Sequence, residues 1–368
     1  MIPWVLSGEV NQKEIFEARN HITQLGLDGS SAKLFPANSV LVAMYGATAA
    51  QTGILRIEAC TNQAVCAILP NDNLRTEYVY YFFLHHKTTL LTQAVGNAQP
   101  NISQTKIKNT LIPVPPLAEQ EEIVEVLDKA FAAINQAKAN IEQNIANAKE
   151  LFQSKLNQIF SQKGDGWEET TLGENVELLP GYAFKSKNYT ENDEGIRLLR
   201  GANIMQGYIR WEGVKRWPKS QVKEYSKFLL EENDIVLAMD RPWVSAGLKV
   251  SKIQPDDLPS LQVQRTARLR TLDHMHWNFL LSLIRSGKFI EYILGGQTGI
   301  GVPHISGKQI LAFAFSLPGL KEQKVISKQI EALSEQMQSV QSHYQTKLTA
   351  LEELKKSILQ KAFAGELT

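Results

Sequence analysis

The chain carries the same order of residues twice. Residues 99–160 and 302–363 match without a gap at a constant offset of 203. The matched pairs include Pro100 and Pro303, Ile102 and Ile305, Ser103 and Ser306, Pro115 and Pro318, Gln120 and Gln323, and Phe160 and Phe363. This period is far longer than the 20 to 50 residues of a solenoid repeat, so each copy is a domain-sized unit and the chain is a tandem duplication.

The duplication extends upstream of these segments. Residues 39–44 match residues 234–239, and residues 2–10 match residues 196–204. The small changes of offset predict short insertions in surface loops. The second copy has one segment without a counterpart, residues 166–195, which we expect to form the entry strand of a domain. We therefore interpret the first copy as shortened at its start, either by a shortened reading frame or because its first strands come from elsewhere.

Each copy divides into a globule and a long helix. The globules contain short β-rich runs punctuated by turn residues, at residues 40–44, 235–238 and 267–270. One helix is expected late in each globule, at residues 77–91 and 276–294. This mixture predicts the α+β class.

The period changes after Pro115-Pro116 and again after Pro318. Apolar residues then recur at steps of three and four, interrupted at Lys138 and Lys155, and no Gly or Pro occurs between Leu117 and Gly164 or between Leu320 and Gly365. Roughly 45 residues at 1.5 Å each make a helix of about 65 Å. Such a stripe must be buried against a partner.

We expect the two long helices to bury their stripes against each other as an antiparallel coiled coil with a pseudo-twofold axis. The alternative, two independent coiled-coil tails that each recruit another protein, stays open. The predicted pairing residues are Leu127, Phe131, Ile134, Ile141, Ile145, Ile330, Met337, Tyr344, Leu348 and Leu351. The predicted domains are residues 1–115, spacer helix 116–163, residues 164–318 and spacer helix 319–368.

Composition describes an ordinary globular chain, with 43% hydrophobic and 21% charged residues. No apolar run reaches the roughly 18 residues of a membrane span, and the first residues have no basic region, so a cytoplasmic protein is expected. Residues 195–275 contain 14 Lys and Arg against 9 Asp and Glu, whereas residues 1–95 contain 6 against 7. The basic second globule is compatible with a polyanionic partner or with a solvated surface.

No catalytic or metal-binding constellation is found in the sequence. The run Pro113-Val114-Pro115-Pro116 lacks the Asn or Asp of an adenine methyltransferase motif, and the glycine-rich residues 295–301 lack the Lys of a P-loop. Cys60 and Cys66 have no histidine partners at zinc-finger spacing, so buried thiols are expected. We interpret His85-His86, His274 and His276 as surface or helix-end residues. No cofactor, no metal and no enzymatic activity are therefore predicted.

The arrangement of globule, helix, globule and helix resembles the DNA specificity subunit of type I restriction-modification systems. The segments that carry the resemblance are residues 2–10, 31–36, 40–46, 61–64, 112–120, 166–174, 199–204 and 361–367. The resemblance implies two target recognition domains that each read one half of a bipartite double-stranded DNA site. It also implies that the paired helices set the number of unread base pairs between the halves, and that two methyltransferase subunits dock on the helices and recruit restriction subunits.

The loops after the central strands, residues 44–53 and 239–249, differ strongly between copies whose flanking strands are alike. This is expected of two readers of different half-sites. Arg241 suits a guanine edge, Gln51 and Gln264 suit adenine, and Lys249, Arg265 and Arg268 suit phosphates. Tyr45, Thr48 and Trp243 complete the candidate DNA-binding set. Two alternatives stay open. Trp243 and Tyr45 pack inside the domains while the Arg residues are ordinary surface charges, or the chain is a protein-interaction scaffold whose globules bind a partner other than DNA.

Overall fold

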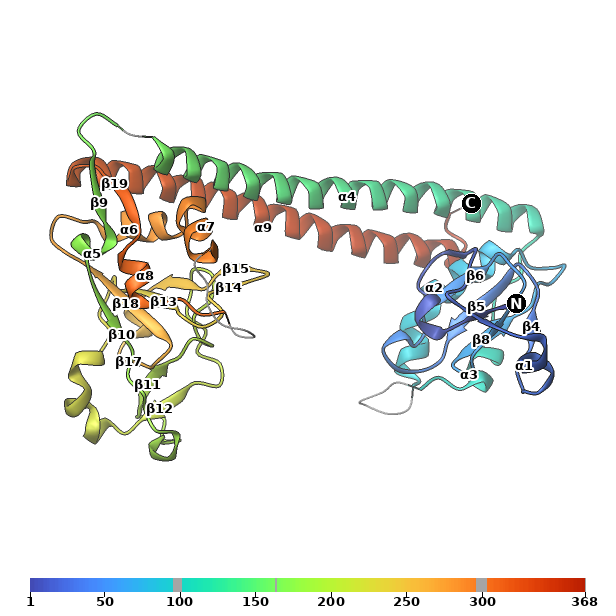
Figure 1. Ribbon diagram of the computed structural model, residues 1–368. Coiled ribbons are helices and arrows are strands. Elements are labelled where there is room, and N and C mark those ends of the chain that lie inside the picture. The colour runs from blue at the N-terminus through green and yellow to red at the C-terminus, as the bar shows by residue number, and fades with distance from the viewer. Residues whose placement is uncertain (95–100, 163, 296–302, 368) are drawn as a thin grey trace. The chain divides into compact units, whose positions relative to one another are not determined.

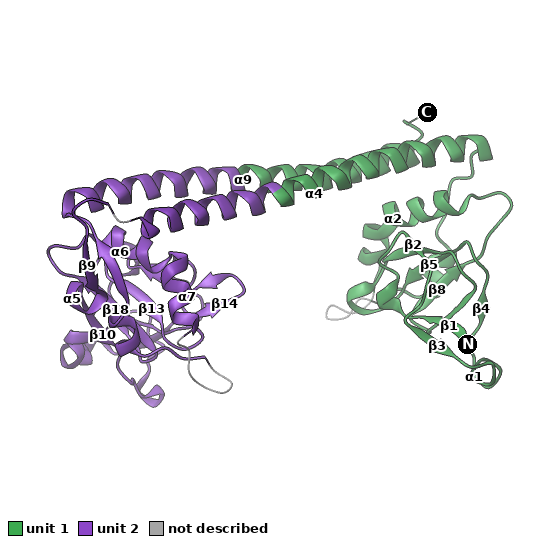
Figure 2. Ribbon diagram, turned by 45° about the horizontal axis from the view of Figure 1, so that its top comes forward, with its two compact units in different colours: residues 1–143, 343–368 green, residues 144–342 purple. Residues whose placement is uncertain are grey.

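The computed structural model describes residues 1–94, 101–162, 164–295 and 303–367. The chain forms two compact units, of which unit 1 comprises Met1–Gln143 and His343–Thr368, and unit 2 comprises Asn144–Ser342 (Figure 2). Each unit therefore contains one globule and a part of each long helix.

Unit 1 contains two four-stranded sheets, in the orders β3-β1-β7-β4 and β2-β6-β5-β8. The strands are β1 (Ile2–Val5), β2 (Glu14–Ile15), β3 (Asn20–Ile22), β4 (Leu34–Phe35), β5 (Ser39–Ala43), β6 (Thr52–Leu55), β7 (Ala59–Thr61) and β8 (Val65–Ile68). The helices are α1 (Gln24–Asp28), α2 (Thr76–Thr92), α3 (Gln104–Lys108) and the short 3-10 helices Ser7–Glu9 and Gly46–Thr48. α2 packs on β5 and β6 and buries most of its aromatic residues between the sheet and the long helices.

Unit 2 is built on a four-stranded sheet, β10-β18-β13-β16, and a three-stranded sheet, β12-β11-β17, with the pairs β14-β15 and β19-β9 beside them. Its strands are β9 (Glu168–Thr171), β10 (Val176–Pro180), β11 (Ile196–Leu199), β12 (Lys215–Trp217), β13 (Ile235–Ala238), β14 (Trp243–Val244), β15 (Gly247–Leu248), β16 (Val250–Lys252), β17 (Ser260–Gln262), β18 (Thr266–Thr271) and β19 (Ala314–Leu317). Its helices are α5 (Leu172–Asn175), α6 (Trp277–Ile284), α7 (Gly287–Gly295), α8 (Gly307–Leu311) and the 3-10 helices Ser186–Asn188, Lys219–Phe228 and Pro255–Asp257.

Strand pairing confirms the duplication. β1 pairs antiparallel with β3 and parallel with β7, and β11 pairs antiparallel with β12 and parallel with β17. β5 lies between β6 and β8, and β13 lies between β16 and β18, all antiparallel. The repeated residues therefore form one scaffold twice, and the α+β class is confirmed.

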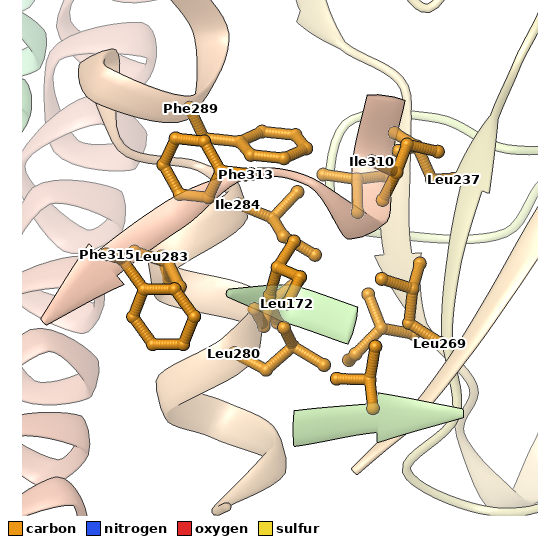
Figure 3. Close-up of a cluster of buried hydrophobic side chains, with 14 of the residues drawn as sticks. Leu172, Leu237, Leu269, Leu280, Leu283, Ile284, Phe289, Ile310, Phe313 and Phe315 are labelled. Atoms are coloured by element: carbon orange, nitrogen blue, oxygen red, sulfur yellow. The ribbon is translucent and has the colours of Figure 1, made fainter. Parts of the chain in front are cut away.

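The segment without a counterpart, residues 166–195, supplies β9, α5 and β10 of unit 2. β9 pairs with β19, and β10 forms the outer strand beside β18. Leu172 of α5 is completely buried, in the cluster that also holds Leu269 and Leu280 (Figure 3). Among the described residues of unit 1, no strand occupies the outer side of β8.

The helix predicted late in each globule is found as predicted in unit 1 but is divided in unit 2. The helix predicted at residues 77–91 is α2, but the one predicted at 276–294 is divided into α6 and α7, which are separated at Arg285 and Ser286. The Ser286 hydroxyl donates a hydrogen bond to the Leu283 carbonyl and accepts one from the Phe289 amide, so it caps the second helix. The glycine-rich residues 296–301 lie outside the described residues.

The long helices are α4 (Leu117–Ser161) and α9 (Leu320–Ala364), and within each unit they run antiparallel (Figure 1). In unit 1, Leu127 and Phe131 share a buried cluster with Leu359, and Lys138 forms an ion pair with Glu352 at 3.2 Å. In unit 2, Leu156 and Phe160 of α4 share the main cluster with Ile326 and Ile330 of α9. The ten predicted pairing residues are all buried or partly buried.

A buried glutamine attaches the start of each long helix to its globule. The Gln120 side chain, which has no exposed surface, accepts from the Arg75 amide at 2.9 Å and donates to the carbonyls of Asn73 and Pro115. Gln323 repeats all three hydrogen bonds in unit 2, with His276, His274 and Pro318. The repeated glutamine therefore anchors the start of each long helix by satisfying backbone groups of the globule.

Replacement of Gln323 by Leu is expected to destabilise unit 2 by roughly 3 kcal/mol, because it leaves buried backbone groups without partners. Urea unfolding followed by tryptophan fluorescence measures this, because five of the six tryptophans lie in unit 2. The exposed Gln336 on the same helix is the matched control. A Gln323→Leu variant as stable as Gln336→Leu would contradict the anchoring role.

Replacement of Ile134 by Asp is expected to destabilise unit 1 by roughly 3 kcal/mol or more, because it places a charge in an apolar seam. Ile134 is 6% exposed, whereas its neighbour Ala133 is exposed. Loss of helical circular dichroism with rising urea compares Ile134→Asp with Ala133→Asp. Equal midpoints for the two variants would show that Ile134 does not lie in a packed seam.

Candidate nucleic-acid interface

The loop after the central strand is held at the same point in both copies. In unit 1 the Ile102 amide donates to the Met44 carbonyl at 2.9 Å, and in unit 2 the Ile305 amide donates to the Met239 carbonyl at 3.0 Å. Both isoleucines are almost completely buried. The backbone that enters each loop is therefore fixed by the repeated segment at residues 101–103 and 304–306.

The serine of each repeated segment starts a short helix. Ser103 accepts from the Lys106 amide and caps α3, and Ser306 accepts from the Gln309 amide and caps α8. The Ile-Ser pair thus joins a loop to a helix, which explains why it recurs. The sequence showed the recurrence, but the contact with the loop depends on the tertiary fold.

In unit 2 the loop projects as a small hairpin. β14 pairs with β15, and Trp243 at its start is 39% exposed. Gln206 donates to the Gly247 carbonyl, so the turn that carries Tyr208, which is 56% exposed, lies against the hairpin. Trp243 is therefore not packed in the interior, and two aromatic rings are available on this surface.

Cations gather at the base of the hairpin. Burial, and then the nearby charges of Arg210 and Arg241, lower the pKa of Lys249. Arg210 and Arg241 are exposed. Arg241 has a φ of 45°, a left-handed conformation that is costly for a side chain with a Cβ, and its amide is held by the Pro303 carbonyl at 2.8 Å. The sequence reasoning missed Arg210, whose place beside the loop comes from a distant turn.

Asp240 lies at the other edge of this surface and contacts two basic side chains. Asp240 lies 2.6 Å from Nδ1 of His304 and 3.7 Å from the Arg265 guanidinium. Arg265 and its neighbour Gln264 are exposed in the turn before β18, and Arg265 has a φ of 68°. Arg265 and Gln264 are therefore accessible to a ligand.

Arg268 does not fit the predicted phosphate contact. Its side chain is buried, pairs with Glu177 of β10 at 2.8 Å and reaches the Lys227 carbonyl. Its neighbours Ala267 and Leu269 point into the main buried cluster, so the Arg268 side chain lies on the opposite face of β18, where it pairs with β10.

The loop of unit 1 is shorter and carries no cation between residues 44 and 51. Tyr45 is 40% exposed, and the Thr48 hydroxyl donates to the Tyr45 carbonyl at 3.2 Å. Gln51 is partly buried, and its Oε1 has no hydrogen-bond partner. Tyr45 is thus accessible, the Thr48 hydroxyl is bonded within the loop, and Gln51 is partly buried.

The remaining polar groups serve the structure. Cys60 and Cys66 are buried free thiols, and burial raises the pKa of both. His85 stacks on Phe363 and His86 on Phe82, so both are partly buried rather than surface residues, and burial lowers the pKa of each.

In the described parts of the chain, no group of His, Cys, Asp and Glu could hold a metal ion. Within the same ranges, no helix is long and apolar enough to cross a membrane.

A family model for the type I restriction modification DNA specificity domain matches residues 1–146 and 164–350, which is most of both copies. The chain belongs to this family. The match in two stretches agrees with the duplicated scaffold.

Curated relatives of this specificity-domain chain are specificity subunits. The chain is 35% identical over 254 residues to the type I restriction enzyme EcoAI specificity subunit of Escherichia coli, which covers 68% of the chain but 42% of that protein. It is 24% identical over 343 residues to the MjaVIII specificity subunit of Methanocaldococcus jannaschii, covering 90% of the chain and 79% of that protein.

Solved structures show the same fold at low sequence identity. A chain from a structure described as the basis of complex assembly and conformational transition of the type I R-M system matches with a TM-score of 0.80 at 18% identity, covering 99% of this chain and 92% of that one. The HsdS subunit from Thermoanaerobacter tengcongensis matches with a TM-score of 0.60 at 19% identity, covering 99% and 90%.

Proposed function

We propose that this chain is the DNA sequence-recognition subunit of a type I restriction-modification complex and reads a bipartite double-stranded site. The observation that carries the proposal is the cationic and aromatic surface of Arg210, Arg241, Trp243, Lys249 and Arg265, placed on a duplicated scaffold at the loop where the copies differ. Guanidinium groups suit guanine edges and phosphates, and ammonium groups suit phosphates. Each loop then reads its own half-site.

Two equivalent apolar positions on the long helices support two copies of one partner. Leu151 of α4 and Leu354 of α9 correspond in the repeat, and they are 62% and 47% exposed. An exposed leucine at the same repeat position of both helices suits two identical subunits. We infer that these are methyltransferase subunits, which in turn bind restriction subunits, and that α4 and α9 set the number of unread base pairs.

Catalysis is assigned to those partners rather than to this chain, which serves as the non-catalytic specificity subunit and binds no cofactor of its own. A complex that binds and modifies cellular DNA would act in the cytoplasm. The second candidate, a coiled-coil scaffold whose globules bind something other than DNA, is not favoured by the family match.

The contributions of Arg241 and Lys249 to DNA binding are separable. Arg241→Ala is expected to lose about 1 to 3 kcal/mol of discrimination at one base pair, because a bidentate contact to a guanine edge is lost. Lys249→Ala is expected to weaken binding to all sequences and to flatten the salt dependence. Competition binding with single-base variants of the site, found by methylation sequencing, measures both.

The matched control is Lys129→Ala, which removes an exposed cation from α4. It is expected to leave both discrimination and salt dependence unchanged. If Arg241→Ala keeps the same methylated motif and the same affinity, the assignment of the loop is wrong.

Assembly with the cognate methyltransferase subunit is expected to give a complex of one chain with two such subunits. Light scattering after co-expression measures its mass. Leu151→Asp or Leu354→Asp is expected to shift the complex toward one methyltransferase subunit, because a charge disrupts one of two equivalent apolar contacts. A chain that stays alone with its cognate subunit would refute the assembly.

A further inference from the structure

Unit 1 has an open sheet edge at the position where unit 2 has a strand. β8 and β18 correspond, because Val65 and Ile68 pair with Ala43 and Val40 as Thr266 and Leu269 pair with Ala238 and Ile235. β18 has β10 on its outer side, whereas β8 is the last strand of its sheet in the described parts of unit 1. An open edge presents unpaired amides and carbonyls to another strand.

A cavity lies beside this edge. It has a volume of about 130 Å³, and its lining includes Val40, Ile68, Leu74 and Val79. The corresponding residues of unit 2 are all members of the buried cluster that also contains Leu172 and Val176: Ile235, Leu269, Met275 and Leu280. A cavity of about 150 Å³ holds a benzene-sized apolar group, so this one has room for a leucine side chain.

A second strand position in unit 1 is also without a partner. Residues 111–114 correspond to β19, which pairs with β9 in unit 2. Among the described residues of unit 1, this segment pairs with no strand, and Leu111 and Val114 are 90% and 57% exposed. The Pro113 carbonyl accepts a hydrogen bond from the Tyr78 hydroxyl at 3.2 Å. The edge of β8, the cavity and this segment are therefore the three positions that β10, α5 and β9 fill in the other copy.

We propose that unit 1 is a docking site for a polypeptide segment of the same type as residues 166–181. The segment would pair with residues 111–114, insert the residue equivalent to Leu172 into the cavity, and add a strand to β8. The argument rests on the occupant of the equivalent positions in unit 2, and it does not depend on the proposed function.

The register of such a strand follows from unit 2. The Gly181 amide donates to the Thr266 carbonyl, and the Leu272 amide donates to the Asn175 carbonyl, so alternate residues of β18 direct their backbone groups toward β10. In unit 1 the corresponding residues are Val65, Ala67 and Leu69. Pro70 corresponds to Thr271, whose amide is not directed to β10, so this proline does not prevent docking.

One position of the occupant should differ from β10. Glu177 pairs with Arg268 in unit 2, but the equivalent of Arg268 in unit 1 is Ala67. A carboxylate there would have no cation. A neutral, β-branched residue therefore suits the site in unit 1 better than Glu.

The first test uses the intact chain and a synthetic peptide of residues 166–181, followed by fluorescence anisotropy and by hydrogen exchange of the chain. Binding is expected to slow amide exchange at Ala67 and Leu69 at least about tenfold, since strand pairing protects outward amides. The Val65 amide already donates to the Asn62 carbonyl at 3.1 Å, so its exchange should change less. A Glu177→Thr peptide is expected to bind more tightly. A Leu172→Asp peptide is the matched control and is expected not to bind.

A second test joins residues 164–195, with the Glu177→Thr change, to Met1 of the chain, because covalent linkage raises the effective concentration to about millimolar. Protection of the Ala67 and Leu69 amides and a higher unfolding midpoint of unit 1 are expected. Ala67→Pro, which removes one outward amide at a sheet edge, should abolish the gain while the unlinked chain keeps its stability. If the joined segment changes neither exchange nor midpoint relative to its Leu172→Asp form, the docking site does not exist.

Discussion

The attachment of the long helices to the globules is the constraint on which the rest of the fold depends. Gln120 and Gln323, both fully buried, satisfy two carbonyls and one amide each at the start of α4 and α9. The other end of each helix is held by an aromatic contact, Phe363 on Tyr78 in unit 1 and Phe160 on Phe279 in unit 2. Each globule therefore contacts the start of one helix and the end of the other, which requires the antiparallel arrangement.

The two copies share the scaffold of strands and helices but differ in the loop that follows the central strand. The buried Ile102 and Ile305 fix the base of both loops, so the loops differ in length and charge without disturbing the strands that carry them. In unit 2, Arg210 and Arg241 lie near Lys249, and Arg265 lies beside Asp240. In unit 1 the loop presents Tyr45 and no cation. A duplicated scaffold with divergent loops suits two surfaces that bind different sequences.

Prediction from the sequence was good where periodicity decided the structure. The apolar stripes of the two long helices, which begin at Leu127 in α4 and at Ile330 in α9, and the central strands were located correctly. Apolar spacing along the sequence reports directly which side chains are buried. Prediction was poorer where the role of a residue depended on the direction of its side chain. Arg268 looked like a phosphate ligand but is buried against Glu177, and the histidines of α2 stack on phenylalanines. Charge and residue type alone do not reveal the face of a strand or helix on which a side chain lies.

The sequence by itself determined the duplication, the α+β class, the two long helices and the family resemblance, because each depends on order and spacing along the chain. Only the tertiary structure decided which cations share a surface. Arg210, Arg241 and Arg265 lie on separate segments, and their proximity to Lys249 and Asp240 arises from strand pairing. It also decided that β8 has no strand on its outer side among the described residues. An unpaired strand has the same local sequence as a paired one, since the partner that satisfies its outward backbone groups lies elsewhere in the chain.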